Sequence, residues 1–103
     1  VMSGLPSDSF IFEGFLPRKK GRKSKLNEIS QNTKTTILYE SPFRIIKTLS
    51  DIKEIIGSER KIALVREISK IYEEVFRGTI EEAIQEYNER TIKGEFVICI
   101  DKA

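Results

Sequence analysis

Two kinds of segment alternate along this chain, and their order restricts the folds that are open to it. Runs rich in β-branched and aromatic residues predict strands. Between these runs, apolar residues recur at helical spacing. Strands that alternate with helices indicate an α/β layered domain with a mixed, roughly five-stranded sheet flanked by helices. The expected strands cover residues 9–16, 33–40, 61–68, 73–79 and 94–101.

The clearest helical pattern follows Ser41 and Pro42. Serine is a good N-cap, and proline suits the first helical position because its fixed φ is already that of a helix. Gly57 supplies the expected C-terminal stop of this helix. Its apolar residues are Ile45, Ile46, Leu49, Ile52 and Ile56.

Two shorter helices are expected before and after it. Ser24 is the candidate N-cap of a helix over residues 24–32. Thr79 and Glu82 have the spacing of a capping box, in which the side chain of each residue bonds the backbone N–H of the other. This spacing predicts a third helix that begins after Thr79 and extends to about Arg90.

Several classes of protein are excluded by what the chain lacks. Its 103 residues suffice for one domain with one core, and 39% hydrophobic with 33% charged residues is typical of a soluble globular protein. There is no histidine, and the one cysteine, Cys99, lies in an apolar run where burial is expected. A zinc site, a disulfide framework and a Ser-His-Asp apparatus are therefore not expected. The lone thiol fits the cytosol, so we expect a cytoplasmic protein. The apolar runs are too short to span a membrane, and no signal peptide is visible.

A short basic segment concentrates the positive charge. Residues 17–25 hold six Lys or Arg and no acid, so they carry +6 and the other residues sum to −4 in a chain of net charge +2. Lysine and arginine neutralise phosphates, and the upstream rings of Phe12 and Phe15 could stack on an unpaired base. The basic segment fits either nucleic-acid binding or a solvated loop that keeps the protein soluble. We expect a mobile loop here, because like charges repel and no apolar residue anchors it.

Two other segments carry polar groups in suggestive places. "YESPFR" (39–44) lies between an expected strand and an expected helix, where open α/β sheets bind ligands, but it also fits a well-capped turn that binds nothing. "REISKIYEEVFRGT" (66–79) alternates acidic and basic residues. These charges fit a salt-bridge lattice between strands or the positioning of a polar substrate, and composition does not decide between the two.

Four stretches taken together, and in this order, carry a family resemblance: "GLPSDSFIFEGFLPRKKGRK", "TTILYESPFRIIKTL", "LVREISKIYEEVFRGTIEE" and "KGEFVICI". They resemble the C-terminal half of the ribosomal RNA small subunit methyltransferase I family, within the tetrapyrrole (corrin/porphyrin) methylase superfamily. The resemblance covers nearly the whole chain. Phe43 stands where that family usually has His, and Ser69 where it usually has Thr, so any role of that His is absent here.

The resemblance implies an S-adenosylmethionine-dependent methyltransferase that modifies the ribose 2′-hydroxyl of a cytidine in small-subunit ribosomal RNA. Enzymes similar to this hold the cofactor in a cleft between two α/β domains and form homodimers. Residues 1–103 would then be a single domain, the C-terminal half, and a missing N-terminal domain would carry much of the cofactor pocket. The isolated chain is accordingly expected to be inactive and to bind S-adenosylmethionine weakly or not at all. No metal and no membrane are expected.

The resemblance and the residue chemistry together nominate three sets of residues. A 2′-hydroxyl is a poor nucleophile, so it must be oriented and must lose its proton. The candidate acid/base or orienting carboxylates are Glu40, Glu67, Glu73 and Glu74, and which of them is the base stays open. The candidate cofactor contacts are Tyr39, Glu40, Ser41 and Pro42. The candidate RNA contacts are Arg18, Lys19, Lys20, Arg22, Lys23, Lys25, Arg44, Arg66 and Lys70.

Two other interpretations stay open. A tetrapyrrole-precursor methylase of the same superfamily would share the fold. The basic segment disfavours it, because a porphyrinoid carries a few carboxylates and not a long polyanion. A non-catalytic binding or dimerisation module is the alternative from another class of function.

Overall fold

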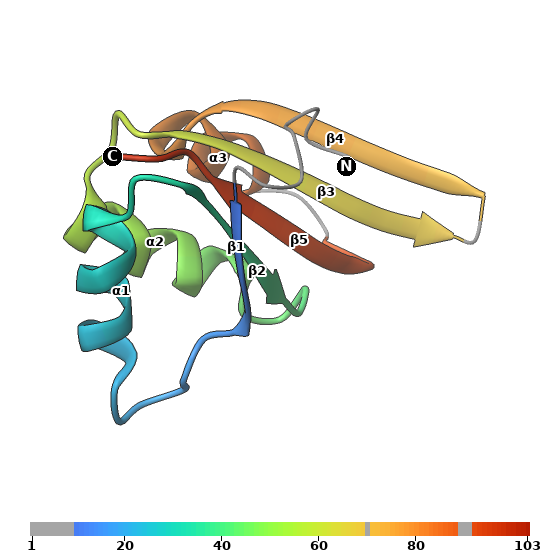
Figure 1. Cartoon of the computed structure of the whole chain (residues 1–103). Coiled ribbons are helices and arrows are strands. Elements are labelled where there is room, and N and C mark those ends of the chain that lie inside the picture. Colours follow the sequence, from blue (N-terminus) through green and yellow to red (C-terminus); the bar gives the residue numbers. More distant parts are fainter. Residues whose placement is uncertain (1–9, 70, 89–91) are drawn as a thin grey trace.

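A mixed sheet forms the centre of the fold, with strand order β1-β2-β5-β3-β4 (Figure 1). The structure is a computed structural model and describes residues 10–69, 71–88 and 92–103. β1 runs parallel to β2, and the other neighbouring pairs are antiparallel, so the predicted α/β fold with a mixed sheet is confirmed. The elements are β1 (Phe10–Phe15), α1 (Arg22–Gln31), β2 (Thr35–Glu40), α2 (Ile45–Ile56), β3 (Lys61–Ser69), β4 (Tyr72–Thr79), α3 (Ile80–Tyr87) and β5 (Glu95–Ile100).

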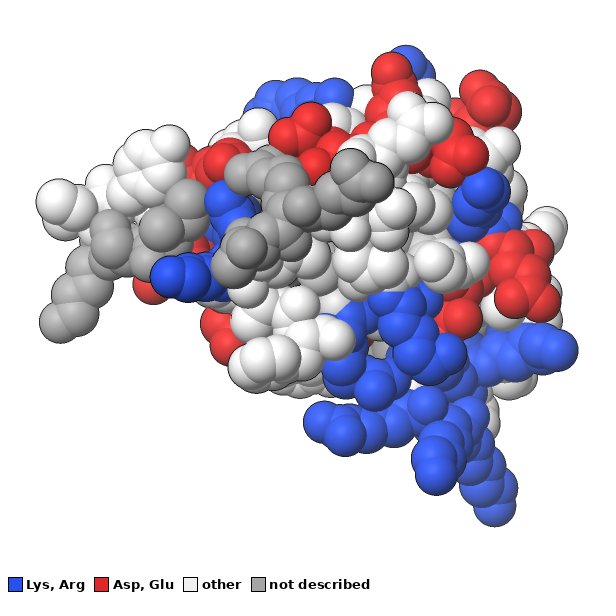
Figure 2. All heavy atoms as spheres, turned by 180° about the vertical axis from the view of Figure 1, so that it is seen from behind, with Lys and Arg blue, Asp and Glu red and all other residues white. Residues whose placement is uncertain are grey.

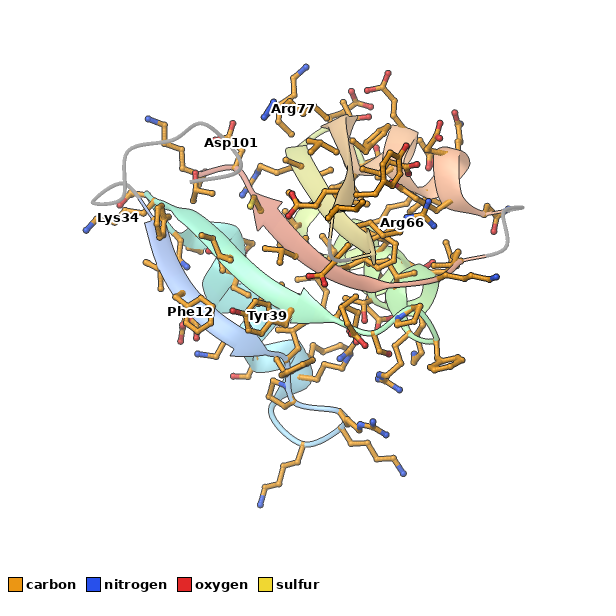
Figure 3. All side chains as sticks on the ribbon, turned by 90° about the vertical axis from the view of Figure 1, so that its right-hand side faces the viewer. Phe12, Lys34, Tyr39, Arg66, Arg77 and Asp101 are labelled. Atoms are coloured by element: carbon orange, nitrogen blue, oxygen red, sulfur yellow. The ribbon has the colours of Figure 1, made fainter. Side chains whose placement is uncertain are left out.

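The three helices of the described residues pack on one face of the sheet. Successive strand residues point to opposite faces, so alternate residues of β2, β3 and β5 meet the helices. Together they form one buried cluster, whose largest fully buried members include Leu26, Leu38, Leu49, Leu64, Tyr87, Phe96 and Ile98. In the described part of the chain no helix covers the opposite face, which Figure 3 views directly. We call it the open face.

A bulge in β1 sets which side chains reach the open face. The register with β2 shifts between Phe12 and Gly14, and Gly14 has a φ of 70° that glycine adopts without strain. The extra residue places Phe12 opposite Ile37 and Phe15 opposite Tyr39 on the same side of the sheet. Without the bulge, Phe12 and Phe15 would point to opposite faces.

Most of the predicted elements are confirmed. Each strand lies within two residues of its expected bounds, Cys99 is buried, and Gly57 is the C-cap of α2. The Thr79 capping box is present, with Glu82 Oε1 accepting the Thr79 N–H at 2.8 Å. That backbone hydrogen bond holds the pKa of the Glu82 carboxyl below its ordinary value. α3 ends at Tyr87, and the rest of its predicted extension to Arg90 lies partly outside the described residues.

The predicted start of α2 is wrong. Its N-cap is Arg44, not Ser41. The Ser41 carbonyl accepts the Arg44 N–H at 3.2 Å, so residues 41–44 form a turn with Pro42 at the second position. Proline is favoured at that position of a turn, and it is also favoured at the first position of a helix. The helix begins where its first buried residue, Ile45, reaches the core.

The predicted start of α1 is also wrong. The helix begins at Arg22 after Gly21, which has a φ of 83°, and Ser24 is exposed inside it. The buried residues of α1 are Arg22, Leu26 and Ile29, at helical spacing. The basic segment is therefore a loop only as far as Gly21, and its remaining cations belong to the first turn of the helix.

No helix in the described residues is long and apolar enough to cross a membrane.

Replacing Gly94 by alanine is expected to destabilise the fold strongly. Gly94 has a φ of +83°, and a Cβ placed on it would lie 1.9 Å from the backbone oxygen of Glu67 on β3. Gly57 is the matched control, because its φ is +110° but a Cβ there would meet nothing within 4 Å. We expect Gly57→Ala to cost about 1–2 kcal/mol through backbone strain alone, and Gly94→Ala about 3 kcal/mol or more because the clash is added. Urea denaturation measures both, and equal losses would contradict the close approach.

Candidate functional site

Exposed cations gather at one corner of the molecule. Figure 2 shows them as a dense group of Lys and Arg at its lower right, where the basic segment joins α1. Arg18, Lys19, Lys20 and Lys23 are exposed there, and we call these four residues the cationic surface. Like charges this close repel one another, and a polyanion relieves that repulsion by neutralising them together. The arrangement is suited to binding phosphates.

Arg22 does not belong to this surface. Only 7% of the residue is exposed, and its guanidinium donates to Asp51 Oδ2 at 3.0 Å, to the Pro17 carbonyl at 3.0 Å and to Thr48 Oγ1 at 2.9 Å. A buried guanidinium with three partners is not available to a phosphate. We therefore correct the expectation for Arg22 from an RNA contact to a structural anchor. A mobile loop was expected because no apolar residue anchors the basic segment. The buried side chain of Arg22 supplies such an anchor.

The other predicted RNA contacts are dispersed. Lys25 pairs with Glu28 at 3.1 Å and with Glu13 at 3.4 Å, and the hydrogen bond that Lys25 donates to Glu28 is the largest cause of the raised pKa of Lys25. Its charge is thus partly neutralised on the surface. Arg44 is half-buried at the start of α2. Lys70 lies outside the described residues.

Arg66 is buried on the helix side of the sheet, so it too is corrected from an RNA contact to a structural residue. Its Nη2 donates to Glu74 Oε2 at 3.2 Å, and its guanidinium lies 5.9 Å from the ring centre of Tyr87. Tyr87 donates its hydroxyl to the other Glu74 oxygen at 3.0 Å. Both oxygens of Glu74 are therefore engaged in a cluster between β4 and α3. This part of the charged segment forms a salt bridge between β3 and β4.

The predicted site residue Glu40 is also buried and engaged. It ends β2 on the helix side, where Thr48 Oγ1 donates to its Oε2 at 2.5 Å and the Ser41 N–H donates to its Oε1 at 2.8 Å. Neither oxygen is directed to the open face, because Tyr39 and Glu40 point to opposite sides of the strand. The "YESP" residues are thus divided between the two faces of the sheet.

A hollow of about 630 Å³ lies on the open face at the carboxyl ends of β2 and β3. Val65 and Val97 form its floor, the rings of Phe15 and Tyr39 form one side, and Glu67 with Glu73 lies on the other. Two of the predicted carboxylates, Glu67 and Glu73, therefore share this hollow, whereas Glu40 and Glu74 do not. Sequence reasoning missed Glu95, which stands opposite Glu67 in the register and also lines the hollow.

Three carboxylates side by side are unfavourable without a partner. Glu73, Glu67 and Glu95 occupy adjacent strands in register, and like charges directly opposite one another in a sheet destabilise it. Among the described residues no group of His, Cys, Asp or Glu is close enough to hold a metal ion. The carboxylates are suited to accept hydrogen bonds from hydroxyls or to face a positive charge.

An aromatic cluster lies at the edge of the hollow, and its member Phe15 precedes the cationic surface by three residues in the chain. The Tyr39 ring packs edge-on against Phe12 at 5.2 Å and Phe15 at 5.6 Å between ring centres. Figure 3 shows Phe12 and Tyr39 side by side on the open face. All three residues remain exposed, Phe15 to 66%. Exposed rings next to cations match what single-stranded nucleic acids require.

Solved structures share this architecture. The chain superposes on the methyltransferase CobJ with a TM-score of 0.63 at 14% identity, covering 99% of this chain and 45% of that one. Cobalt precorrin-4 methyltransferase, CbiF, gives a TM-score of 0.54 at 16% identity and covers 87% and 39% of the two chains. The chain thus shares the fold of part of these methyltransferases.

The sequence comparison is more specific. Residues 2–84 match the family model of the tetrapyrrole (corrin/porphyrin) methylases. The chain belongs to this family. It is 48% identical over 102 residues to ribosomal RNA small subunit methyltransferase I of Halalkalibacterium halodurans, covering 98% of this chain and 35% of the relative. The protein of the same name from Synechocystis is 43% identical over 101 residues, covering 97% and 36%. The chain thus spans about a third of the length of these relatives.

Proposed function

We propose that the full-length protein containing this chain transfers a methyl group from S-adenosylmethionine to the ribose 2′-hydroxyl of a cytidine in small-subunit ribosomal RNA. In this proposal the chain is the C-terminal domain. The observation that carries it is the similarity, at 43–48% identity over nearly the whole chain, to relatives named for small-subunit ribosomal RNA methylation. The relatives extend well beyond the matched part, which supports a further domain outside these 103 residues.

The cationic surface supports a long polyanionic substrate. Its four exposed charges adjoin exposed rings, so phosphates and unpaired bases could be bound side by side. A tetrapyrrole precursor, the substrate of the competing proposal, has no comparable run of phosphates. The similarity to CobJ and CbiF reflects the fold and does not favour their substrates, because the identities are only 14% and 16%.

The open-face hollow has the chemistry of a partial cofactor site. S-adenosylmethionine supplies the methyl group as a positively charged sulfonium, with ribose hydroxyls and an adenine ring. Glu67, Glu73 and Glu95 could accept hydrogen bonds from hydroxyls or face the positive charge, and Tyr39 could contact the ring. The Ser41 amide, which bonds Glu40, and Pro42 in the turn would position this edge without contacting the cofactor directly.

The proposed chemistry requires alignment and proton removal. The 2′-oxygen attacks the sulfonium methyl carbon in line, the carbon–sulfur bond breaks, and the hydroxyl proton passes to a base. Glu67 and Glu73 are the candidates from this chain, since both are exposed on the open face. The family resemblance further leads us to propose a cytoplasmic homodimer.

Glu67→Gln and Glu73→Gln in the full-length protein are expected to lower kcat, by about 10²-fold for whichever carboxylate takes the proton. Glu59→Gln is the matched control, because that carboxylate is exposed in the turn before β3, lines neither the hollow nor the cationic surface, and should leave kcat unchanged. The rate of methyl transfer to small ribosomal subunits, at saturating cofactor, gives kcat for all three variants. Full activity of both hollow variants would remove these carboxylates from the chemistry.

A further inference from the structure

We infer that Arg22 and Thr48 are positioning residues that hold the basic segment and the turn after β2 in a fixed relation. The RNA-binding part of this inference rests on the proposed function, and the structural part does not. The two segments are far apart in the sequence, and each lies at one of the proposed contact regions. A chain of buried and partly buried hydrogen bonds connects them without a gap.

The first half of this chain anchors the basic segment. Arg22 Nη1 donates to the carbonyl of Pro17, the residue immediately before the cationic surface begins. Arg22 Nε donates to Asp51 on α2, which fixes the plane of the guanidinium. The backbone on both sides of Arg18, Lys19 and Lys20 is thus tied to one buried group. Displacement of Arg22 would move the exposed charges as a set.

The second half reaches the turn. Thr48 Oγ1 accepts from Arg22 Nη2 at 2.9 Å and donates its own proton to Glu40 Oε2. Glu40 Oε1 in turn accepts the backbone N–H of Ser41 at 2.8 Å. The Thr48 hydroxyl, with 1% of the residue exposed, therefore joins the two halves of this hydrogen-bond chain within the described residues. Removing that hydroxyl takes one hydrogen-bond partner from Arg22 and one from Glu40, and so breaks the hydrogen-bond connection between them.

Stability alone does not explain the use of charged residues here. Replacing a buried ion pair by well-packed apolar side chains often leaves a protein as stable or more stable. Each bond of the network instead has a fixed direction and a fixed partner, which specifies geometry. A displacement of about 1 Å at a site can reduce a rate by about 10²-fold, so such specification has functional value.

Thr48→Val and Thr48→Ser in the full-length protein test the inference. Valine keeps the shape of threonine and lacks the hydroxyl, whereas serine keeps the hydroxyl. We expect Thr48→Val to speed amide hydrogen exchange at both residues 17–25 and 40–44, and Thr48→Ser to do so much less. Exchange in β5 monitors the core and should not change. Faster exchange in only one of the two segments, or in neither, would overturn the inference whether or not the protein binds RNA.

RNA binding separates positioning from direct contact. We expect Arg22→Gln to weaken binding of small-subunit RNA by about tenfold with little change in the salt slope, because Arg22 touches no phosphate. Lys23→Gln, its neighbour on the cationic surface, should instead reduce the slope by about one. An Arg22→Gln variant that flattens the slope as Lys23→Gln does would show that Arg22 contacts RNA directly. Wild-type protein without salt-dependent RNA binding would contradict the proposed function and leave the exchange test standing.

Discussion

Replacing the whole cationic surface, Arg18, Lys19, Lys20 and Lys23, by alanine in the full-length protein is expected to weaken RNA binding by about 10²-fold near 0.1 M salt. Each of these side chains is exposed, so each can neutralise one phosphate and release its counterion. The slope of log affinity against log salt concentration should fall in magnitude by about three, at about 0.7–0.9 per lost contact. Filter binding or fluorescence anisotropy over a range of salt concentrations measures both quantities. Arg22 is left intact, because its removal would disturb the backbone that carries the other charges.

A control with the same change in net charge shows whether place matters. Lys34, Lys61, Lys93 and Lys102 are also exposed but lie outside the cationic surface, and Figure 3 places Lys34 at the opposite end of the sheet from the basic segment. Replacing these four by alanine should change the salt slope by less than about one. If the two quadruple variants flatten the slope equally, the attraction is a property of net charge and the cationic surface has no special role.

The isolated 103-residue chain is expected to transfer no methyl group, whereas the full-length protein should be active. The hollow that supplies the candidate carboxylates is open on the sheet face, so water would enter it, and no helix among the described residues closes over it. Loss of alignment between donor and acceptor removes an advantage of about 10⁵-fold or more. Transfer of label from S-adenosylmethionine to small ribosomal subunits measures this, with calorimetry reporting cofactor binding separately. Turnover by the isolated chain at a rate near that of the full-length protein would contradict the two-domain proposal.

The sequence predicted the sheet well because strand formation here depends on local pattern. The buried run at Phe96–Ile100 and the alternating residues of β3 leave few other arrangements for these segments. Helix starts were predicted less well, since their signals serve more than one structure. Ser41 and Pro42 fit a turn as well as an N-cap, and only the position of the buried Ile45 decides between them.

The candidate site was predicted only in part. A sequence motif groups residues that are adjacent in the chain, whereas adjacent residues of a strand point to opposite faces of the sheet. Arg66 and Glu67 are adjacent in sequence but face opposite sides of β3, as do Glu73 and Glu74 on β4. The alternation of side chains along a strand predicts that Arg66 and Glu74 lie on one face and that Glu67 and Glu73 lie on the other. The burial of Arg22 was harder to foresee. It occupies the position that an apolar residue would take in the stripe of α1, and its partners Thr48 and Asp51 are distant in sequence.

The position of the transferred methyl group tests the central claim most directly. We combine the full-length protein with small ribosomal subunits and labelled S-adenosylmethionine, and then treat the modified RNA with alkali. Alkaline cleavage of a linkage requires a free 2′-hydroxyl on the preceding ribose. We predict one alkali-resistant linkage that carries the label on the ribose of a cytidine. Label on a base, or no label on RNA together with methylation of a tetrapyrrole precursor, would contradict the proposed function.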